Sequence, residues 1–383
     1  MSTLLSPLLA RRMTLANRIV MAPLTRARAG RGHVPNALLA EYYSQRASAG
    51  LVITEATMIA ADGCAYISEA GLIDDKCVEG WRSVTEAVHR CNGQIIVQLW
   101  HPGRATHSVL NSGAQPVSST DRPILGHTIR TPNGPRSYEP PRRLGLDELP
   151  TIVNLFGAAA QRARRAGFDG VEIHGANGYL LDQFLRDSVN DRDDEYGGSI
   201  ENRARLLLEV LDAAIDVFGA DRTAMRLSPL VDFNQIQDSK PLELVRYVAQ
   251  QADRRRIAFL EIRHADHSAP MEQAVALEVR RNFRGRFFRN GGFDRASAFE
   301  TIRRGEADAI VFGRPFIANP DLVERLEKDA TLAAFNPKTL YTPGPGGYTD
   351  YPTLTGRVAS EVHGATGSTR RADSSASPAR PAD

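Results

Sequence analysis

The stretch Gly170-Val-Glu-Ile-His-Gly-Ala-Asn-Gly-Tyr-Leu-Leu-Asp-Gln-Phe-Leu185 starts as a short apolar run and then breaks into glycine and polar residues. His174, Asn177 and Tyr179 follow one another closely within it. A buried strand ending in such a cluster is typical of parallel α/β folds, whose strands present their carboxyl ends to the site. His and Asn can both donate to one oxygen, and Tyr can supply a proton. The stretch favours a catalytic strand end over the alternative, a buried His followed by an ordinary Asn-Gly turn.

Strand and helix patterns alternate along the chain on both sides of this stretch. Strands are predicted at residues 18–23, 51–56, 94–100, 170–175, 223–229, 257–264, 286–290 and 309–313. Helices are predicted at residues 35–50, 75–90, 147–167, 199–218, 241–255, 271–283, 294–304 and 320–328, with Asp147 as a helix cap. This series indicates an α/β protein with a single (β/α)8 TIM barrel. A doubly wound sheet would usually carry a G-x-G-x-x-G turn after its first strand, and that turn is missing.

Three segments are expected to lie outside the regular repeat. Residues 4–15 contain short apolar stretches that suggest an N-terminal hairpin. Residues 105–146 form a long insertion after the third strand, rich in Gly, Pro, Ser and Asn, and such loops are usually functional or mobile. From residue 356 onward the composition shifts to Ser, Ala, Arg, Gly and Pro. We therefore expect one barrel domain over residues 1–355 and a disordered tail over residues 356–383.

Bulk composition excludes several classes of protein. The 383 residues are 42% hydrophobic and 24% charged, and the net charge of +2 gives no reason to expect nucleic acid or a membrane as partner. No apolar run approaches the roughly 20 residues of a membrane span, and no signal peptide is expected. Cys64, Cys77 and Cys91 match no zinc or iron–sulfur spacing, which suggests a reducing, cytoplasmic setting without a metal. His101 and His107 are interpreted as loop residues, with metal binding as the lesser alternative.

The carboxyl ends of all barrel strands meet at one face, so residues that follow different strands are brought together there. Gly291 and Gly292 follow the seventh predicted strand, and Gly313 and Arg314 follow the eighth. Barrels often hold a phosphate at these two loops, because glycine lets backbone N–H groups approach closely. Arg314 would add charge-assisted hydrogen bonds. The alternative is two ordinary turns beside a surface arginine.

Polar groups at the other strand ends suit a flavin ring. Gln98 offers both a donor and an acceptor to a heterocyclic amide edge. Arg226 can neutralise negative charge on a reduced ring, and Thr25 can tune an electron-rich ring by one hydrogen bond. Together with a phosphate site, these groups fit flavin mononucleotide (FMN). No pair of carboxylates converges among the residues collected at the strand ends, which makes glycosidase chemistry unattractive.

A series of motifs then resembles the old yellow enzymes, which are FMN-dependent ene-reductases on a (β/α)8 barrel. The resemblance covers roughly residues 5–354 and rests on motif order. The motifs are Met21-Ala-Pro-Leu-Thr-Arg26, Gln98-Leu-Trp-His-Pro-Gly-Arg104, His174-Gly-Ala-Asn-Gly-Tyr-Leu-Leu-Asp-Gln-Phe-Leu185, Asn190-Asp-Arg192, Tyr196-Gly-Gly-Ser-Ile-Glu-Asn-Arg203, Phe312-Gly-Arg-Pro-Phe-Ile-Ala-Asn-Pro-Asp321 and Gly347-Tyr-Thr-Asp-Tyr-Pro352.

The resemblance implies a role for each matching residue. His174 and Asn177 match the pair that binds the substrate oxygen, and Tyr179 matches the proton donor. The implied flavin ring contacts are Pro23, Leu24, Thr25, Ala56, Gln98 and Arg226. The implied ribityl-phosphate contacts are Gly291, Gly292, Gly313 and Arg314. The implied pocket lining is Tyr66, Trp100 and Tyr341, besides His174 and Asn177.

The implied reaction takes hydride from NADPH or NADH and reduces the C=C bond of small α,β-unsaturated carbonyl or nitro compounds. A monomer or homodimer is expected. Two alternatives are a flavin-binding barrel without turnover and a dienoyl-CoA reductase-type relative with an iron–sulfur cluster. The intact His174, Asn177 and Tyr179 argue against the first, and the scattered cysteines argue against the second. The stretch Arg263-His-Ala-Asp-His267 and Arg289 depart from the family pattern.

Overall fold

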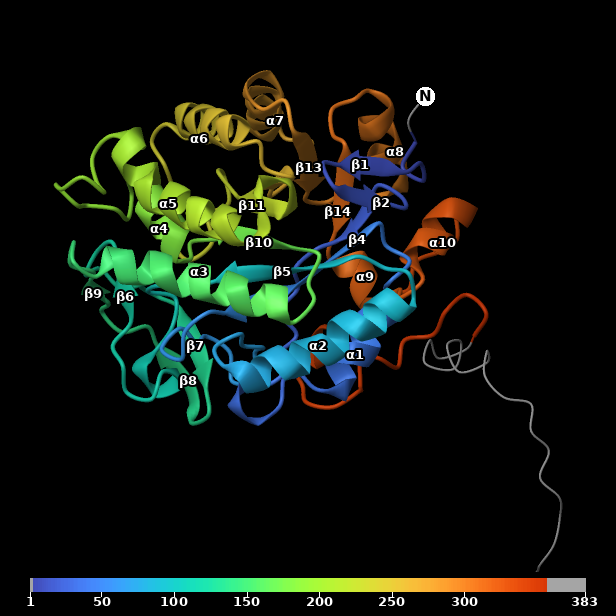
Figure 1. Cartoon of the computed structure of the whole chain (residues 1–383), viewed down its shortest axis with the longest axis horizontal. Coiled ribbons are helices and arrows are strands. Elements are labelled where there is room, and N and C mark those ends of the chain that lie inside the picture. Colours follow the sequence, from blue (N-terminus) through green and yellow to red (C-terminus); the bar gives the residue numbers. More distant parts are fainter. Residues whose placement is uncertain (1–2, 357–383) are drawn as a thin grey trace, which may run out of the picture.

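Eight parallel strands close into a barrel surrounded by helices, which confirms the predicted TIM fold (Figure 1). The computed structural model describes residues 3–356, so the predicted tail lies outside the described residues except for Gly356. Around the barrel, each strand pairs with the next strand of the barrel in sequence, and β14 pairs with β3 to close it. The barrel strands are β3 (Ile19–Met21), β4 (Leu51–Met58), β5 (Ile95–Trp100), β10 (Gly170–Gly175), β11 (Thr223–Leu227), β12 (Phe259–Arg263), β13 (Arg286–Asn290) and β14 (Ala309–Phe312).

A helix follows each barrel strand, as the sequence pattern predicts. These helices are α1 (Ala37–Ser44), α2 (Asp75–Arg90), α3 (Leu149–Arg165), α5 (Ile200–Phe218), α6 (Pro241–Arg255), α7 (Pro270–Asn282), α8 (Arg295–Arg303) and α10 (Leu322–Lys328). Two short helices directly after strands were not predicted, α4 (Leu180–Leu185) and α9 (Arg314–Ala318). They are too short to show a helical period in the sequence.

Three predicted boundaries need correction. The first barrel strand ends at Met21, before Pro23, because proline has no N–H to donate to a neighbouring strand. Helix α1 begins after Asn36, whose side-chain oxygen accepts from two backbone N–H groups, and it ends at Ser44 well before Gly50. Helix α3 begins after Glu148, without a side-chain cap, so the expected cap at Asp147 is wrong.

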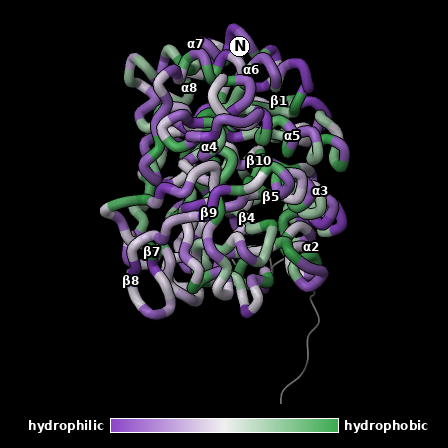
Figure 2. The backbone as a smooth tube through the Cα atoms, turned by 90° about the vertical axis from the view of Figure 1, so that its left-hand side faces the viewer, coloured by the Kyte–Doolittle hydropathy of each residue, from purple (hydrophilic) through white to green (hydrophobic). Residues whose placement is uncertain are grey.

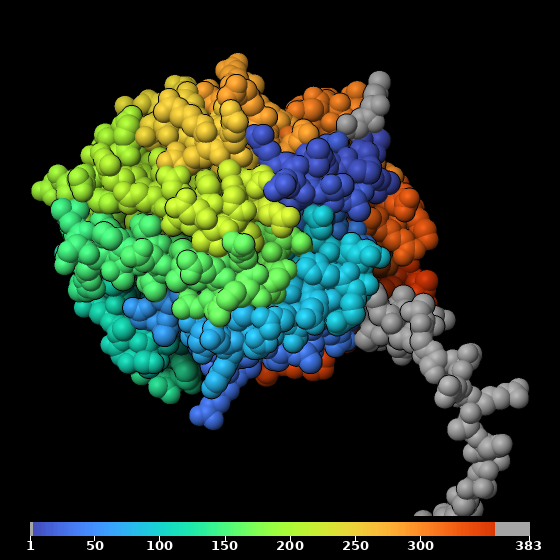
Figure 3. Space-filling view, in the orientation of Figure 1, coloured from blue at the N-terminus to red at the C-terminus, as the bar shows by residue number. Residues whose placement is uncertain are grey.

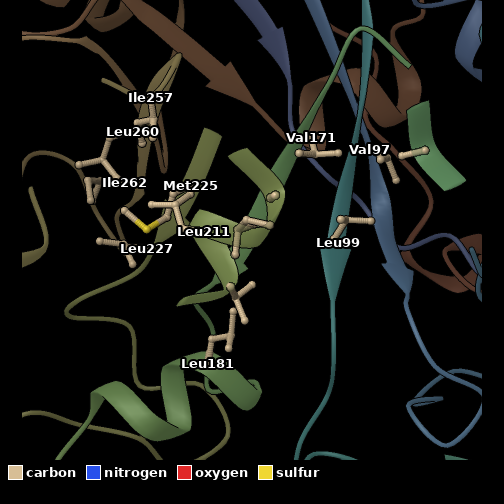
Figure 4. Close-up of a cluster of buried hydrophobic side chains, with 14 of the residues drawn as sticks. Val97, Leu99, Val171, Leu181, Leu211, Met225, Leu227, Ile257, Leu260 and Ile262 are labelled. Atoms are coloured by element: carbon tan, nitrogen blue, oxygen red, sulfur yellow. The ribbon is translucent and has the colours of Figure 1, made fainter. Parts of the chain in front are cut away.

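Apolar side chains on the outer face of the barrel strands pack against the helices. Figure 4 shows Val97, Leu99, Val171, Met225, Leu227, Leu260 and Ile262 of four adjacent strands together with Leu181 of α4 and Leu211 of α5. All ten residues labelled there are buried. Burial of each such side chain contributes about 1.5–3 kcal/mol, so the barrel is a firm frame for groups at its rim. The hydropathy tracing shows the same pattern, with hydrophobic strands inside and hydrophilic segments outside (Figure 2).

The predicted N-terminal hairpin is present as β1 (Leu8–Ala10) and β2 (Met13–Leu15). Leu8, Met13 and Leu15 belong to a second apolar cluster with residues of the barrel interior, including Phe259 and Phe288. The segment lies beside the C-terminal part of the chain in the space-filling view (Figure 3), and Arg286 Nε donates to Leu9 O at 2.8 Å. The hairpin therefore helps to fill the interior and leaves the carboxyl face for function.

The predicted insertion is ordered and docks on the carboxyl side. Residues 105–146 form β6 (Val117–Ser118), β9 (Arg142–Arg143) and a hairpin of β7 (Thr128–Thr131) and β8 (Gly134–Ser137). Leu125 N donates to Gln235 Oε1 at 2.7 Å, and Arg104 donates to Arg122 O and Gln235 O at 3.0 and 2.9 Å. These bonds join the insertion to the loop after β11. Within residues 3–356, no helix has the length and hydrophobicity that a bilayer span requires.

Candidate functional site

A cavity of about 690 Å³ opens at the carboxyl ends of the barrel strands. Its volume falls in the range of small-molecule and cofactor sites. It collects residues from opposite ends of the chain, including every predicted site residue except Trp100. The predicted residues that line it are Pro23, Leu24, Thr25, Ala56, Tyr66, Gln98, His174, Asn177, Tyr179, Arg226, Gly291, Gly292, Gly313, Arg314 and Tyr341.

A turn directly after β10 carries Asn177 and Tyr179. Asn177 and Gly178 both have left-handed backbone conformations, with φ of 58° and 71°. Asn177 N donates to Ser228 Oγ at 2.7 Å, which anchors the turn to the loop after β11. A Cβ at Gly178 would lie 2.4 Å from Phe233 O, so the close approach of the two loops requires glycine there. The turn places Asn177 and Tyr179 on the same cavity as His174.

His174 is held as a neutral donor. Its Nδ1 accepts from the backbone N–H of Ala176 at 3.2 Å, which leaves the ring proton on Nε2. Burial, Arg226 and Arg263 hold the pKa of His174 well below its usual value. Within residues 3–356, the buried side-chain oxygen of Asn177 has no hydrogen-bond partner, so the amide is not tied to the protein through that atom. The imidazole N–H of His174 and the amide N–H groups of Asn177 are thus neighbouring donors available to one oxygen of a ligand.

Tyr179 is buried among aromatic rings, with its hydroxyl 3.5 Å from the Tyr66 hydroxyl. Its ring lies edge-on to Trp100 at 4.4 Å and to His174 at 5.2 Å. Burial raises the pKa of Tyr179 above its usual value, so the hydroxyl keeps its proton at neutral pH. Trp100, expected in the pocket lining, is fully buried and does not line the cavity; it supports Tyr179 from behind.

Two side chains at one end of the cavity are held by buried carboxylates that the sequence analysis missed. Gln98 Nε2 donates to Glu172 Oε2 at 2.6 Å, and Arg226 Nε lies 2.8 Å from Glu261 Oε1. Both carboxylates are fully buried. A sequence signal existed, because each acid is a lone charge inside an apolar strand that later ends in His174 or Arg263.

Glycines and guanidinium groups form the other end of the cavity. Gly291 and Gly292 have φ of 124° and 77°, and a Cβ at Gly291 would lie 2.3 Å from His264 O. No acid pairs with Arg314 or Arg263 within residues 3–356, and Arg263 Nη1 is buried without a hydrogen-bond partner. Cations that converge without a counter-ion favour an anionic ligand. A glycine cradle, unpaired arginines and the Gln98 amide together fit the phosphate and ring of FMN.

Behind Arg263, the unusual residues form a network that supports the glycine loop. Arg289 Nε donates to His264 Nε2 at 3.2 Å, and His264 Nδ1 lies 2.6 Å from Glu272 Oε2. Arg289 also donates to His267 O, and His267 Nδ1 lies 2.9 Å from Gly291 O. These side chains hold the loop, and His264 also lines the cavity. No group of three or more potential metal ligands occurs in residues 3–356, and His101 and His107 lie buried in the loop after β5.

A second cavity of about 410 Å³ adjoins the first under the β7–β8 hairpin. Tyr66, Tyr179, Phe233 and Tyr341 line both cavities. The hairpin and the irregular segment that follows it contribute Ile129, Arg130 and Tyr138, among others. The insertion therefore builds an outer, mainly aromatic and apolar chamber next to the Tyr179 hydroxyl. Sequence reasoning did not assign Phe233 or the insertion to the site, because neither follows a strand directly.

Comparisons with known proteins match this geometry. The model of the NADH:flavin oxidoreductase / NADH oxidase family matches residues 3–332. A probable flavin mononucleotide-dependent alkene reductase of Leishmania infantum is 45% identical, covering 91% of this chain and 97% of the relative. The 12-oxophytodienoate reductase 7 of Oryza sativa subsp. japonica is 43% identical, covering 92% and 94%.

Solved structures agree with the sequence relatives. Morphinone reductase in complex with tetrahydroNAD superposes with a TM-score of 0.89 at 42% identity, covering 92% of this chain and 98% of that one. The old yellow enzyme homologue of Zymomonas mobilis gives the same TM-score at 44% identity, covering 92% and 100%.

Proposed function

This chain belongs to the NADH:flavin oxidoreductase / NADH oxidase family, and on that premise we propose a role for each residue of its cavity. It is an FMN-dependent, NAD(P)H-dependent ene-reductase of the old yellow enzyme type. The proposed flavin ring site is formed by Pro23, Leu24, Thr25, Ala56, Gln98 and Arg226. The proposed ribityl-phosphate site is formed by Gly291, Gly292, Gly313 and Arg314.

The proposed substrates are α,β-unsaturated carbonyl and nitro compounds. His174 Nε2 and the Asn177 amide donate to the carbonyl or nitro oxygen and stabilise the negative charge that develops there. FMN held by the ring and phosphate sites would supply the hydride chemistry, with NAD(P)H as the source of the hydride. The Tyr179 hydroxyl gives its proton to the α-carbon. The aromatic outer chamber accommodates the apolar remainder of the substrate and keeps water away.

One observation carries this assignment: a neutral His174 donor, a free Asn177 amide and a protonated Tyr179 share one wall of one cavity. A barrel that only bound flavin would have no use for a buried proton donor. We also propose a cytoplasmic location, since all three cysteines are unpaired. The oligomeric state is proposed as monomer or homodimer.

The purified protein tests the proposal directly. We expect a yellow protein that releases FMN on heating, identified by mass, and that bleaches on anaerobic addition of NADPH or NADH. An enone should restore the colour. The double variant His174→Ala with Asn177→Ala should lower turnover by at least about 100- to 1,000-fold, the cost of one oxyanion donor. It should also weaken the binding of phenols, while Ser108→Ala, outside both cavities, serves as a control. Bound FAD, no flavin, or unchanged turnover in the double variant would refute the assignment.

A further inference from the structure

Two buried carboxylates stand directly behind the side chains that face the flavin ring site. Glu172 of β10 is the Cα partner of Gln98 on β5, and Glu261 of β12 is the Cα partner of Arg226 on β11. Both acids have no exposed surface, and neither lines the cavity. They lie within the barrel, where an acid without a function would be costly.

The four side chains form two polar pairs on neighbouring strands. Gln98 Nε2 donates to Glu172 Oε2 at 2.6 Å, and Arg226 Nε lies 2.8 Å from Glu261 Oε1. Glu172 Oε1 and Glu261 Oε2 are buried and make no hydrogen bond within residues 3–356. One guanidinium can balance the charge of only one carboxylate inside a protein. We therefore expect one of the two acids to keep its proton.

The neighbours of each acid decide which one carries the charge. Two carboxylates buried near each other inside a protein cannot both ionise readily. Glu261 lies against the Arg226 guanidinium, whereas the hydrogen-bond partner of Glu172 within residues 3–356 is the neutral Gln98 amide. The charge is therefore best placed on Glu261 and the proton on Glu172. Burial raises the pKa of both groups, and Glu172 is raised well above its usual value, in line with this assignment.

We propose that Glu172 and Glu261 are positioning residues that carry one negative charge between them, orient the Gln98 amide and offset the charge that Arg226 presents to the flavin ring. This inference rests on the proposed function, because it assumes that Gln98 and Arg226 face the ring. With its NH₂ group held by Glu172, Gln98 turns its carbonyl oxygen toward an N–H of the ligand. With Nε beside Glu261 and Nη2 donating to Asn290 Oδ1 at 3.4 Å, the Arg226 guanidinium is fixed at the cavity, and the negative charge of Glu261 limits how strongly it favours an anionic reduced ring.

Two nearly isosteric variants separate the roles of the two acids. Glu261→Gln removes the negative charge beside Arg226, so reduced FMN should bind about tenfold more tightly relative to oxidised FMN. For a two-electron couple this raises the midpoint potential by about 30 mV. Glu172→Gln replaces one neutral group by another that can still accept from Gln98. Its midpoint potential should equal that of the wild type.

The measurement is the midpoint potential of bound FMN, obtained by equilibration with a reference dye, together with the Kd of oxidised FMN from flavin fluorescence. Glu172→Leu provides neither donor nor acceptor, and it should weaken oxidised FMN binding where Glu172→Gln does not. Glu261→Asp retains the charge and should keep the potential close to that of the wild type. Melting temperatures of all variants report any general loss of structure.

Each outcome of these measurements either supports or overturns the inference. An unchanged or lowered potential in Glu261→Gln overturns the inference, and so does an equal rise in both glutamine variants. If Glu261→Gln does not fold, Glu172→Gln decides, because a raised potential there means that Glu172 carried the charge. Failure of the proposed function would differ, since the wild-type protein itself would then lack FMN or resist reduction by NAD(P)H.

Discussion

Replacement of Tyr179 by phenylalanine removes the proposed proton donor and little else. The Tyr179 hydroxyl makes one hydrogen bond within residues 3–356, to Tyr66 at the long distance of 3.5 Å. Loss of a weak hydrogen bond costs less than about 1 kcal/mol, because the ring keeps its contacts with Trp100 and His174. We therefore expect Tyr179→Phe to fold normally, with a melting temperature within about 2–4 °C of the wild type.

The kinetic effect should be large and confined to one half-reaction. Loss of a general acid costs about 100- to 10,000-fold, and only the step that delivers a proton to the α-carbon needs it. Stopped-flow absorbance of the flavin should show an unchanged half-reaction with NADPH and a strongly slowed half-reaction with an enone. A nitroalkene should be much less affected, because its hydride adduct is a stable nitronate anion.

Tyr66→Phe is the matched control, since it removes the other hydroxyl of the same pair and leaves its ring beside Tyr341 at 5.7 Å. It should slow enone reduction far less than Tyr179→Phe does. If Tyr179→Phe slows the NADPH half-reaction as much as the enone half-reaction, or if Tyr66→Phe has the larger effect, the assignment of the donor is wrong.

Four further perturbations test other parts of the structure. Gly178→Ala should destabilise the protein by about 1–3 kcal/mol in denaturant unfolding, because φ is 71° and the new Cβ would lie 2.4 Å from Phe233 O; an unchanged midpoint would contradict this. Burial raises the pKa of Glu69 to about 8. Between about pH 4.5 and 8 the folded state therefore binds one more proton at Glu69 than the unfolded state does. As a result, the free energy of unfolding decreases by about 1.4 kcal/mol for each unit by which the pH rises. Glu69→Gln should remove this contribution to the pH dependence of the unfolding free energy, measured by denaturant unfolding at pH 5, 6 and 7. An equal pH dependence in the variant and the wild type would refute the assignment. Arg314→Ala should weaken FMN binding at least tenfold, which corresponds to about one charge-assisted hydrogen bond, and should leave riboflavin binding unchanged. An equal loss of affinity for FMN and riboflavin would place Arg314 away from the phosphate. Removal of residues 356–383 should leave melting temperature and turnover intact, as their composition predicts, and a clear drop in either would show that the segment docks.

Much of the fold could be predicted because strands buried on both faces read as short apolar runs. Residues 170–175 and 309–313 are such runs, and glycine or polar residues end them, so their carboxyl ends located the cavity. The series of eight strand–helix units then predicted a closed barrel, and hence the pairing of β14 with β3, which no local sequence pattern encodes. The start of α3 could not be predicted, because Asp is a preferred N-cap residue, yet the helix begins after Glu148, whose carboxylate pairs with Arg142 instead of capping the helix.

The residues that sequence reasoning missed act through contacts distant in the chain. Phe233 reaches the site because the loop after β11 lies against the turn at Gly178, and Glu261 matters because its strand neighbours Arg226. Trp100 lies at the end of its strand, where a lining residue is expected. The ring of Tyr179, however, lies between Trp100 and the cavity. The alternation of side chains along a strand predicts the face on which a residue lies, but not how deeply it is buried. It therefore cannot distinguish a residue that lines the cavity from a residue buried behind it.

The pairing of the first barrel strand with the last has a consequence for biosynthesis. Ile19 of β3 pairs with Ile310 of β14, and Arg18 donates to Asp308 O, so strands almost at opposite ends of the chain depend on each other. A ribosome adds about 5–20 residues per second, so β3 waits on the order of 15–60 seconds for its partner. Until then, the apolar residues of the N-terminal hairpin have no completed interior to fill. The nascent chain thus exposes an unpaired strand edge for most of its synthesis, which makes it a natural client for a chaperone that binds such segments.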